Sequence, residues 1–333
     1  MNNIIQITKS NTIFSGSDDD LELMHEEFKK QHFIKLPSFV EPGLLKFIQH
    51  KIKQGGFYED RYKVGKGDAA DYRLKDKSTD SLLRFLMNDQ DLFKLIEQIT
   101  CCSQIRSFNG AVYSLASNCG HYDTWHKDDW DNRMISMSIN LSTDVYSGGV
   151  LQIRDCKSKK ILGEVANTGF GDAIIFLVSP QIEHKVTDVE GKVAKIAFPG
   201  WFKSKPSYRS LLKRFPQFKN RTSGTKVAVS EHSTIVKKKE LFSRIFKEEF
   251  LIFNPENTVC YGLNLIGERI LNLIEEPITV KEIQDVIIHE YDVGPKQCKQ
   301  DVLSLLQELV ANEIVAVQEQ KFVLLSDLTG VRT

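Results

Sequence analysis

The feature that most constrains the fold is a series of short apolar runs between residues 104 and 205. Five such runs, rich in β-branched and aromatic residues, are separated by clusters of Gly, Asp, Ser and Pro. In chain order they are IRSFNGAVYSL, MISMSINL, GVLQIR, DAIIFLV and AKIAFPGWF. Short strands that follow one another without helices between them are typical of a β-sandwich or a β-barrel. We therefore expect an all-β core in this part of the chain.

The first hundred residues show helical signals instead. Asp18–Asp20 can cap one helix, Pro42 can open a second, and residues 79–99 carry apolar side chains at helical spacing. Phe33–Leu36 is typical of a strand between the first two helices. Helices first and strands later predict an α+β fold in which the helices brace one face of the β-core.

Residues 54–78 are rich in glycine and charge, and we expect a long loop there. A loop of that length in a compact domain is often functional. Residues 55–78 are therefore a candidate substrate lid, with Tyr58, Tyr62 and Arg73 as the candidate contacts.

The whole-chain composition excludes several classes of protein. The 44 Lys and Arg residues balance 44 Asp and Glu, so net charge gives no sign of nucleic-acid binding. No apolar run approaches the roughly 20 residues that cross a bilayer, and the N-terminus lacks a signal-peptide pattern. The six cysteines lack zinc-ligand spacing and are expected to be reduced thiols. We expect a cytoplasmic protein without membrane or nucleic-acid partners, and the oligomeric state is left open.

Charge changes abruptly along the second half of the chain. Residues 203–240 contain eleven Lys or Arg and two Glu, whereas residues 241–325 contain seven Lys or Arg and fourteen Asp or Glu. Such a shift marks a domain boundary. The predicted organisation is a domain over 1–205, a basic linker over 206–240 and a second domain over 241–325.

One short motif carries metal-binding chemistry. In a strand, residues two apart point to the same face, so His126 and Asp128 can offer an imidazole and a carboxylate to one ion. His184, which follows a later apolar run, is the candidate third ligand. Two histidines and one carboxylate leave coordination positions open, as non-haem iron(II) requires. A second copy of the motif, His121 with Asp123, leaves the register open at this point.

The surrounding residues resolve that ambiguity through a resemblance. Residues 105–205 resemble the prolyl-4-hydroxylase-like iron(II)/2-oxoglutarate oxygenases, and the spacing of that family's motifs selects His126 over His121. The matching features are Tyr113, Gly120, His126, Asp128, Arg133–Leu141, Gly148–Leu151, Gly171–Phe176 and His184. The resemblance implies a double-stranded β-helix (jelly-roll) core. It also implies iron(II) as cofactor, with 2-oxoglutarate and O2 as co-substrates.

The same family requires a cation for the distal carboxylate of 2-oxoglutarate. Lys195 stands eleven residues after His184 and six before Trp201, which is close to the spacing of the family. Lys192 is the alternative, but it lies nearer to the expected turn. The resemblance implies that Lys195 binds this carboxylate and that Tyr113 adds a hydroxyl.

The C-terminal region has a different pattern. Three short apolar runs, three amphipathic helices and a short β-wing over 241–325 predict a small winged-helix-like domain. The T-x-x-E sequence at Thr279–Glu282 predicts a capping box for the second helix. Winged helices that bind DNA present cations to phosphate. This domain has seven more acidic than basic residues, which disfavours DNA.

Residues 242–317 resemble the coenzyme PQQ synthesis protein D (PqqD-like) family of peptide-recognition domains. The matching segments are Leu263–Asn264, Ile270–Ile274, Thr279–Ile283 and Asp301–Leu309. The resemblance implies a RiPP recognition element that binds the leader of a ribosomally synthesised precursor peptide. The leader would add as a strand to about Thr258–Leu263. Candidate contacts are Val259, Tyr261, Cys298, Val302 and Leu305.

Together these features predict an oxygenase that hydroxylates a side chain of a leader-bearing precursor peptide. The alternative is the same chemistry on a folded protein or a small metabolite, with the C-terminal domain as an interaction module. The sequence does not distinguish hydroxylation from other oxidative outcomes.

Overall fold

The computed structural model describes residues 4–64, 67–117, 123–166, 169–205, 228–238, 240–246 and 249–318. The chain divides into two compact units. Unit 1 consists of Met1–Lys219 with Phe242–Gly262, and unit 2 consists of Asn220–Leu241 with Leu263–Thr333. Among the described residues, no helix combines the length and the apolarity needed to cross a membrane.

Unit 1 begins with a short hairpin and the predicted helices. Strands β1 (Ile5–Ile7) and β2 (Thr12–Phe14) precede helix α1, whose first turn carries a capping box formed by Ser17 and Asp20. The capping box satisfies N–H groups that the first helical turn leaves open. The strand predicted over Phe33–Leu36 and the helix predicted from Pro42 are both confirmed. The bounds are α1 (Asp18–Gln31), β3 (Phe33–Leu36), α2 (Pro42–Gly55), α3 (Lys77–Met87) and α4 (Gln90–Thr100).

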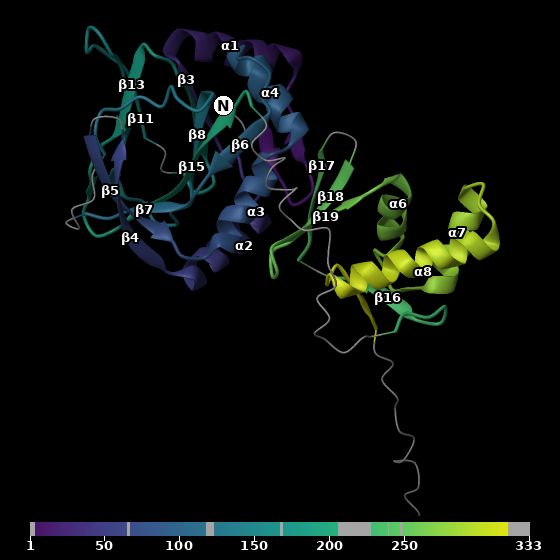
Figure 1. Ribbon diagram of the computed structural model, residues 1–333. Coiled ribbons are helices and arrows are strands. Elements are labelled where there is room, and N and C mark those ends of the chain that lie inside the picture. Colours follow the sequence, from purple (N-terminus) through teal and green to yellow (C-terminus); the bar gives the residue numbers. More distant parts are fainter. Residues whose placement is uncertain are drawn as a thin grey trace, which may run out of the picture. The chain divides into compact units, whose positions relative to one another are not determined.

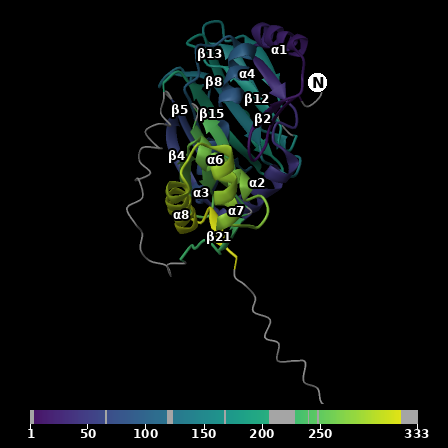
Figure 2. The same cartoon turned by 90° about the vertical axis from the view of Figure 1, so that its right-hand side faces the viewer.

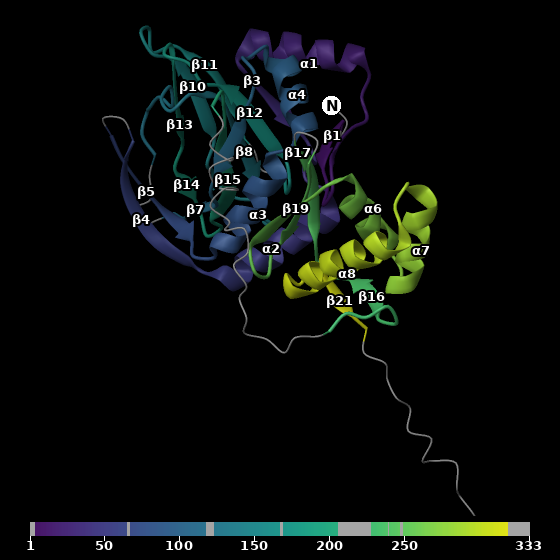
Figure 3. The same cartoon turned by 45° about the vertical axis from the view of Figure 1, so that its right-hand side comes forward.

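The prediction of a long loop over residues 54–78 was wrong. These residues form a long hairpin of β4 (Phe57–Val64) and β5 (Gly67–Leu74), and β5 also pairs with β7. Polar contacts tie the ribbon together: the Tyr62 hydroxyl donates to Asp71 at 2.8 Å and accepts from Arg73 at 2.8 Å. Strand alternation was hard to recognise because polar residues occupy both faces of the ribbon. Figure 3 shows β4 and β5 as a ribbon at the side of the barrel away from the helices.

The β-core contains two larger sheets, as the predicted jelly-roll requires. The main sheet has the order β3-β12-β8-β15-β7-β5-β4, with β6 paired to β15, and the smaller sheet has the order β11-β10-β13. A two-stranded sheet of β14 and β9 completes it. The remaining bounds are β6 (Ser107–Gly110), β7 (Tyr113–Leu115), β8 (Arg133–Asn140), β9 (Ser147–Gly148), β10 (Leu151–Asp155), β11 (Ile161–Val165), β12 (Ala173–Leu177), β13 (Ile182–Val186), β14 (Val189–Glu190) and β15 (Lys195–Lys203).

Strand alternation gives the main sheet two different faces. On β8, Ile135 and Met137 are fully buried in the core that the helices share, whereas Ser136 and Ser138 point into a cavity on the other face. Figure 1 shows helices α1 to α4 gathered on one side of the strands. The helices therefore brace one face, as predicted, and leave the other face for chemistry.

A three-stranded sheet from the C-terminal region also belongs to unit 1. This C-terminal sheet consists of β17 (Phe242–Phe246), β18 (Glu249–Asn254) and β19 (Val259–Leu263), in that order. Its apolar face joins the main core: the Phe242 ring lies 5.4 Å from Phe47 of α2, and Phe253 stacks on Phe85 of α3 at 5.3 Å. The structure thus differs from a boundary at residue 241, because the buried face of this sheet is shared with the helices of unit 1.

Unit 2 contains helices α6 (Leu265–Leu273), α7 (Val280–Glu290) and α8 (Pro295–Ala311). Figure 2 shows the three helices gathered together. The predicted capping box of Thr279 and Glu282 is confirmed at the start of α7. A small sheet of the order β20-β16-β21 accompanies the helices, with bounds β16 (Thr234–Lys237), β20 (Ile278–Thr279) and β21 (Val315–Val317).

Strand β16 comes from the segment predicted to be a linker. Residues 234–237 pair with both neighbours in the small sheet, so the end of the basic segment is part of unit 2. The apolar sequence at 321–325, expected to close a wing, lies outside the described residues.

Candidate metal centre

Two of the predicted ligands are joined through their backbones. His126 and His184 form an isolated antiparallel bridge and exchange two N–H···O bonds of 3.0 Å. Directly opposed residues in such a bridge point to the same side, and the two imidazole rings lie 4.2 Å apart between centroids. His184 lies on β13, and the bridge holds the backbone of His126 beside it.

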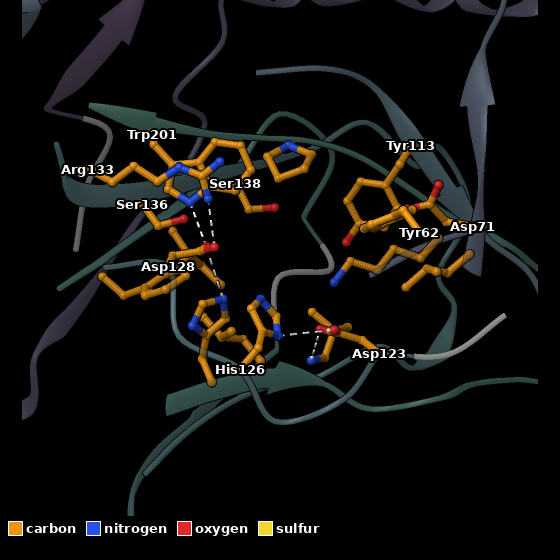
Figure 4. A pocket seen from close by; sticks show the side chains of 18 of the residues that line it. Tyr62, Asp71, Tyr113, Asp123, His126, Asp128, Arg133, Ser136, Ser138 and Trp201 are labelled. Atoms are coloured by element: carbon orange, nitrogen blue, oxygen red, sulfur yellow. Dashed lines mark hydrogen bonds and ion pairs between the residues drawn. The ribbon is translucent and has the colours of Figure 1, made fainter. Parts of the chain in front are cut away.

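Asp128 is positioned by side chains rather than by a strand. The sequence predicted a strand through residues 126–128, but only His126 pairs, and residues 127–130 have no regular structure. The Asp128 carboxylate instead accepts hydrogen bonds from Arg133 at 2.7 Å and from the Trp201 indole at 2.6 Å. Figure 4 shows both donors on the same side of the carboxylate. Arg133 is itself stacked between the rings of Trp130 and Trp201, at 3.7 and 3.6 Å from their centroids.

The three groups are close enough to share one ion. One ligand atom from each of His126, Asp128 and His184 lies within 4.8 Å of the other two. Burial lowers the pKa of His184 to about 3, so this imidazole stays neutral, which is the form that binds a metal. Two imidazole nitrogens and one carboxylate form the ligand set that non-haem iron(II) prefers. The residues present therefore fit an iron(II) ion.

Asp123 supports the centre, and its role was missed from the sequence. Its carboxylate accepts from the Val186 N–H at 2.8 Å and lies 3.3 Å from Nδ1 of His126. The carbonyl of Thr124 lies 2.7 Å from the same nitrogen. Because both neighbours are acceptors, Nδ1 carries the proton and Nε2 is left as the ligand atom. The carboxylate of the rejected second motif thus orients the first, and His121 lies outside the described residues.

Lys195 is buried and lines the same cavity as the three candidate ligands. Its side chain is 4% exposed, and Nζ donates to the Gly149 carbonyl at 2.8 Å. Gly149 has a φ of +61°, and an added Cβ would lie 3.0 Å from Cδ of Lys195. The glycine turn therefore makes room for the lysine stem. Burial lowers the pKa of Lys195 to about 8, and nearby Asp123 opposes that shift.

Tyr113 lies on β7, paired with Ala197 of β15, and lines the same cavity. Burial raises its pKa well above the ordinary value, so the hydroxyl remains a donor. Lys195 and Tyr113 are therefore brought to one wall of one cavity. The role of each in binding 2-oxoglutarate is a prediction from the resemblance.

The cavity has a volume of about 430 Å³, and the β4–β5 hairpin forms part of its wall. Tyr62, Asp71 and Arg73 line it, whereas Tyr58 is 40% exposed and lies outside the lining. Figure 4 shows Tyr62 and Asp71 beside Tyr113, across the cavity from Asp128. Burial raises the pKa of Asp71 to about 6, against the opposing charge of Arg73. Two of the three predicted lid residues thus face the cavity.

The predicted leader contacts fall into two groups. Val259 and Tyr261 lie two apart on β19 and are half-buried, while Cys260 between them faces the core of unit 1. Cys298 and Val302 of α8 are each 2% exposed within unit 2, and Leu305 is half-buried. Only the first pair lies on the C-terminal sheet, on the face opposite to Cys260. The leader-binding role of all these residues remains a prediction.

Two family models match separate parts of the chain. Residues 109–203 match the 2OG-Fe(II) oxygenase superfamily, and residues 249–315 match coenzyme PQQ synthesis protein D. Both resemblances predicted from the sequence are confirmed. A comparison with curated proteins found no match.

Several solved structures are similar to parts of the chain. A Pseudomonas putida prolyl-4-hydroxylase is 16% identical, with 55% of this chain and 91% of that chain covered and a TM-score of 0.39. A Trichoplax adhaerens prolyl hydroxylase, in complex with a hypoxia inducible factor oxygen degradation domain peptide fragment, is 14% identical, with 59% and 97% covered and a TM-score of 0.41.

A third structure, TbiB1 in complex with the TbiA(beta) leader peptide, is 26% identical, with 24% of this chain and 93% of that chain covered and a TM-score of 0.23. The family matches and the assembled triad of His126, Asp128 and His184 together assign residues 109–203 to an iron(II)- and 2-oxoglutarate-dependent oxygenase domain and residues 249–315 to a PqqD-like domain.

Proposed function

We propose that this protein hydroxylates a side chain of a ribosomally synthesised precursor peptide that it recruits through the leader. The observation that carries the proposal is the presence in one chain of a buried two-histidine, one-carboxylate centre and a PqqD-like segment. An oxygenase needs only its own barrel to react with a small molecule. A peptide-recognition segment is useful when the substrate is itself a peptide.

The side chains of the cavity would divide the work of binding. His126, Asp128 and His184 would hold iron(II), and Lys195 with Tyr113 would bind the distal carboxylate of 2-oxoglutarate. When bound, iron(II) with 2-oxoglutarate and O2 supplies insertion of one oxygen atom into an unactivated C–H bond, with succinate and carbon dioxide as the other products.

The polar and apolar walls of the cavity have complementary tasks. Arg133 and Trp201 hold the Asp128 carboxylate in place through hydrogen bonds to both of its oxygens. Apolar side chains from facing sheets, including Leu151, Ile174 and Phe176, line the cavity and exclude water from the reacting groups.

Strand addition is the mode of leader binding that the C-terminal sheet favours. Strand β19 is the last strand in the order β17-β18-β19, and edge strands accept an added peptide strand through main-chain hydrogen bonds. Val259 and Tyr261, which face away from the core, would contact alternate leader side chains. Cys298 and Val302 remain part of the proposed leader-binding set, although the structure buries both.

The proposal is tested by mass spectrometry of a precursor peptide treated with the full-length protein. We expect a mass increase of one oxygen atom per modified residue, about tenfold or more faster with the full precursor than with the leaderless core peptide, because the bound leader raises the local concentration of the core. The His184→Ala variant provides the inactive control.

The comparison should not use a deletion of residues 241–333, because that cut removes Phe242 and Phe253 from the core of unit 1. A better variant than the deletion is Val259→Lys, which places a charge on the edge strand. It should weaken leader binding and leave turnover of the leaderless core peptide unchanged. Equal rates with and without the leader would contradict leader recognition. They would favour the alternative of a folded protein or small metabolite as substrate.

A further inference from the structure

One buried arginine joins the C-terminal sheet to helices α3 and α4 within unit 1. Arg244 of β17 is 1% exposed, and its Nε lies 3.2 Å from the Asp89 carboxylate. The guanidinium also donates to the carbonyls of Thr8 at 2.8 Å, Ser243 at 2.8 Å and Leu86 at 3.3 Å. A planar guanidinium that bonds several backbone segments at once holds them in one geometry.

The partners of Arg244 make this a specific junction. Asp89 caps α4 by accepting from the Leu92 N–H, and Leu86 lies in the last turn of α3. The arginine therefore joins the end of one helix to the beginning of the next. A cation at a helix C-terminus and beside an N-cap carboxylate is favourable on both counts. The apolar contacts of Phe242 with Phe47 and of Phe253 with Phe85 join the same sheet to α2 and α3.

The C-terminal sheet and the metal centre lie on opposite sides of the main sheet. On β8, Met137 faces the helical core, and Ser136 and Ser138 line the cavity; on β12, Ile175 faces the helices and Ile174 the cavity. The C-terminal sheet packs on α2 and α3, on the helical side. Figure 1 shows β17 and β19 beyond these helices, away from the barrel strands.

We propose that this junction sets a minimum spacer between the leader and the residue that is modified, an inference that rests on the proposed function. A leader strand bound at β19 is held on the catalytic unit itself, not on a free tether. A straight path through the helical layer to the main sheet spans roughly 20 Å, or about six extended residues. A peptide must pass around the edge of the sheet, so the minimum is about ten residues.

The test is a series of precursor peptides whose spacer between leader and modifiable residue is shortened stepwise, assayed with the full-length protein. Modification should fall at least tenfold when the spacer has four residues instead of twelve. Binding of the fluorescein-labelled peptides, measured by anisotropy, should stay within twofold across the series. Equal modification at four and twelve residues would overturn the proposal.

The same series separates this inference from the proposed function. If no peptide binds, or if the leader does not accelerate the reaction, the proposed function itself fails. If the leader accelerates modification equally at every spacer length, recruitment stands and only the fixed geometry fails.

A paired variant tests the junction directly. Arg244→Met with Asp89→Asn removes both buried charges, while asparagine can still cap α4. We expect leader affinity and turnover of a leaderless core peptide to stay within twofold, and the four-residue spacer to regain at least part of its activity. The matched control is Arg269→Met with Glu290→Gln, an exposed ion pair of unit 2, which should leave the spacer dependence unchanged. Unchanged spacer dependence in a folded Arg244 variant would contradict the role of this residue.

Discussion

The metal centre and the C-terminal sheet are held in place by opposite kinds of contact. At the centre, polar groups position polar groups: Asp128 is fixed by two donors, and His126 by a backbone bridge and Asp123. The C-terminal sheet is held by aromatic side chains around one buried ion pair of Arg244 and Asp89.

Because of this difference, we expect substitutions at the metal centre to affect activity and substitutions beneath the C-terminal sheet to affect stability. Changes at the centre remove ligands or their orientation, and the helical core on the other face of the main sheet stays intact. Substitutions beneath the C-terminal sheet leave a cavity in that core or leave a buried charge without its partner. They have no direct effect on the ligands. The predictions below test this separation.

The largest effect should come from a metal ligand. His126→Ala removes one of three ligands, so succinate release from 2-oxoglutarate should fall to background. The thermal midpoint should stay within a few degrees, because the side chain contributes to the cavity and not to the helical core. His289→Ala, on the exposed side of α7, is the control. Succinate release at the normal rate would exclude the assigned centre.

The C-terminal sheet should show the reverse behaviour. Arg244→Met leaves the Asp89 carboxylate buried without its cation, a change that costs about 3–5 kcal/mol of unfolding free energy. Urea unfolding measures the loss, and the added Asp89→Asn substitution should recover part of it. Arg269→Met, at an exposed ion pair, should show no measurable change. A loss of 2-oxoglutarate turnover in folded Arg244→Met protein would contradict the expectation that this region affects stability and not activity.

Orientation of His126 should have an intermediate effect. Asp123→Ala removes the carboxylate beside Nδ1 and should weaken metal affinity about 10–100-fold, the usual result when a ligand loses its outer partner. Anaerobic titration with iron(II) or cobalt(II) measures this without reference to activity. Asp129→Ala, at an exposed neighbouring carboxylate, is the control. Unchanged affinity would mean that the Thr124 carbonyl alone orients the ring.

The pH dependence of 2-oxoglutarate binding should follow the protonation state of Lys195. Its pKa is lowered to about 8, so the amine is charged below that pH and neutral above it. Only the charged form attracts a carboxylate, and kcat/KM for 2-oxoglutarate should therefore fall about tenfold per unit as pH rises beyond 8. Lys195→Met should have a low kcat/KM without this decline. A flat profile for the unaltered protein would assign the carboxylate to another residue.

The smallest effects should lie in the hairpin. Tyr62→Phe removes the hydroxyl that joins Asp71 to Arg73 in the cavity wall, and KM for the peptide should rise a few-fold. Tyr58→Ala changes an exposed ring outside the cavity and should leave kcat and KM unaltered. Equal effects of both substitutions would place the substrate across the outer face of the hairpin.

The sequence predicted the elements that have a clear local signal. The capping box at Thr279, the start of α2 at Pro42 and strand β3 depend on neighbouring residues and were found where expected. The β4–β5 hairpin was missed because charge and glycine hide its alternation. Asp123 was read only as part of a rival ligand pair, since its contact with Val186 joins residues 63 positions apart.

By itself, the sequence identified the candidate ligands, since few residue types bind iron(II) and the identities of residues 126, 128 and 184 are read directly from the chain. It also identified the PqqD-like segment that follows. Only the tertiary structure decided how Asp128 is held without a strand, and which core receives the C-terminal sheet. An antiparallel sheet has an apolar face that any suitable surface can bury, and here Phe47 of α2 and Phe85 of α3 belong to the surface that buries it.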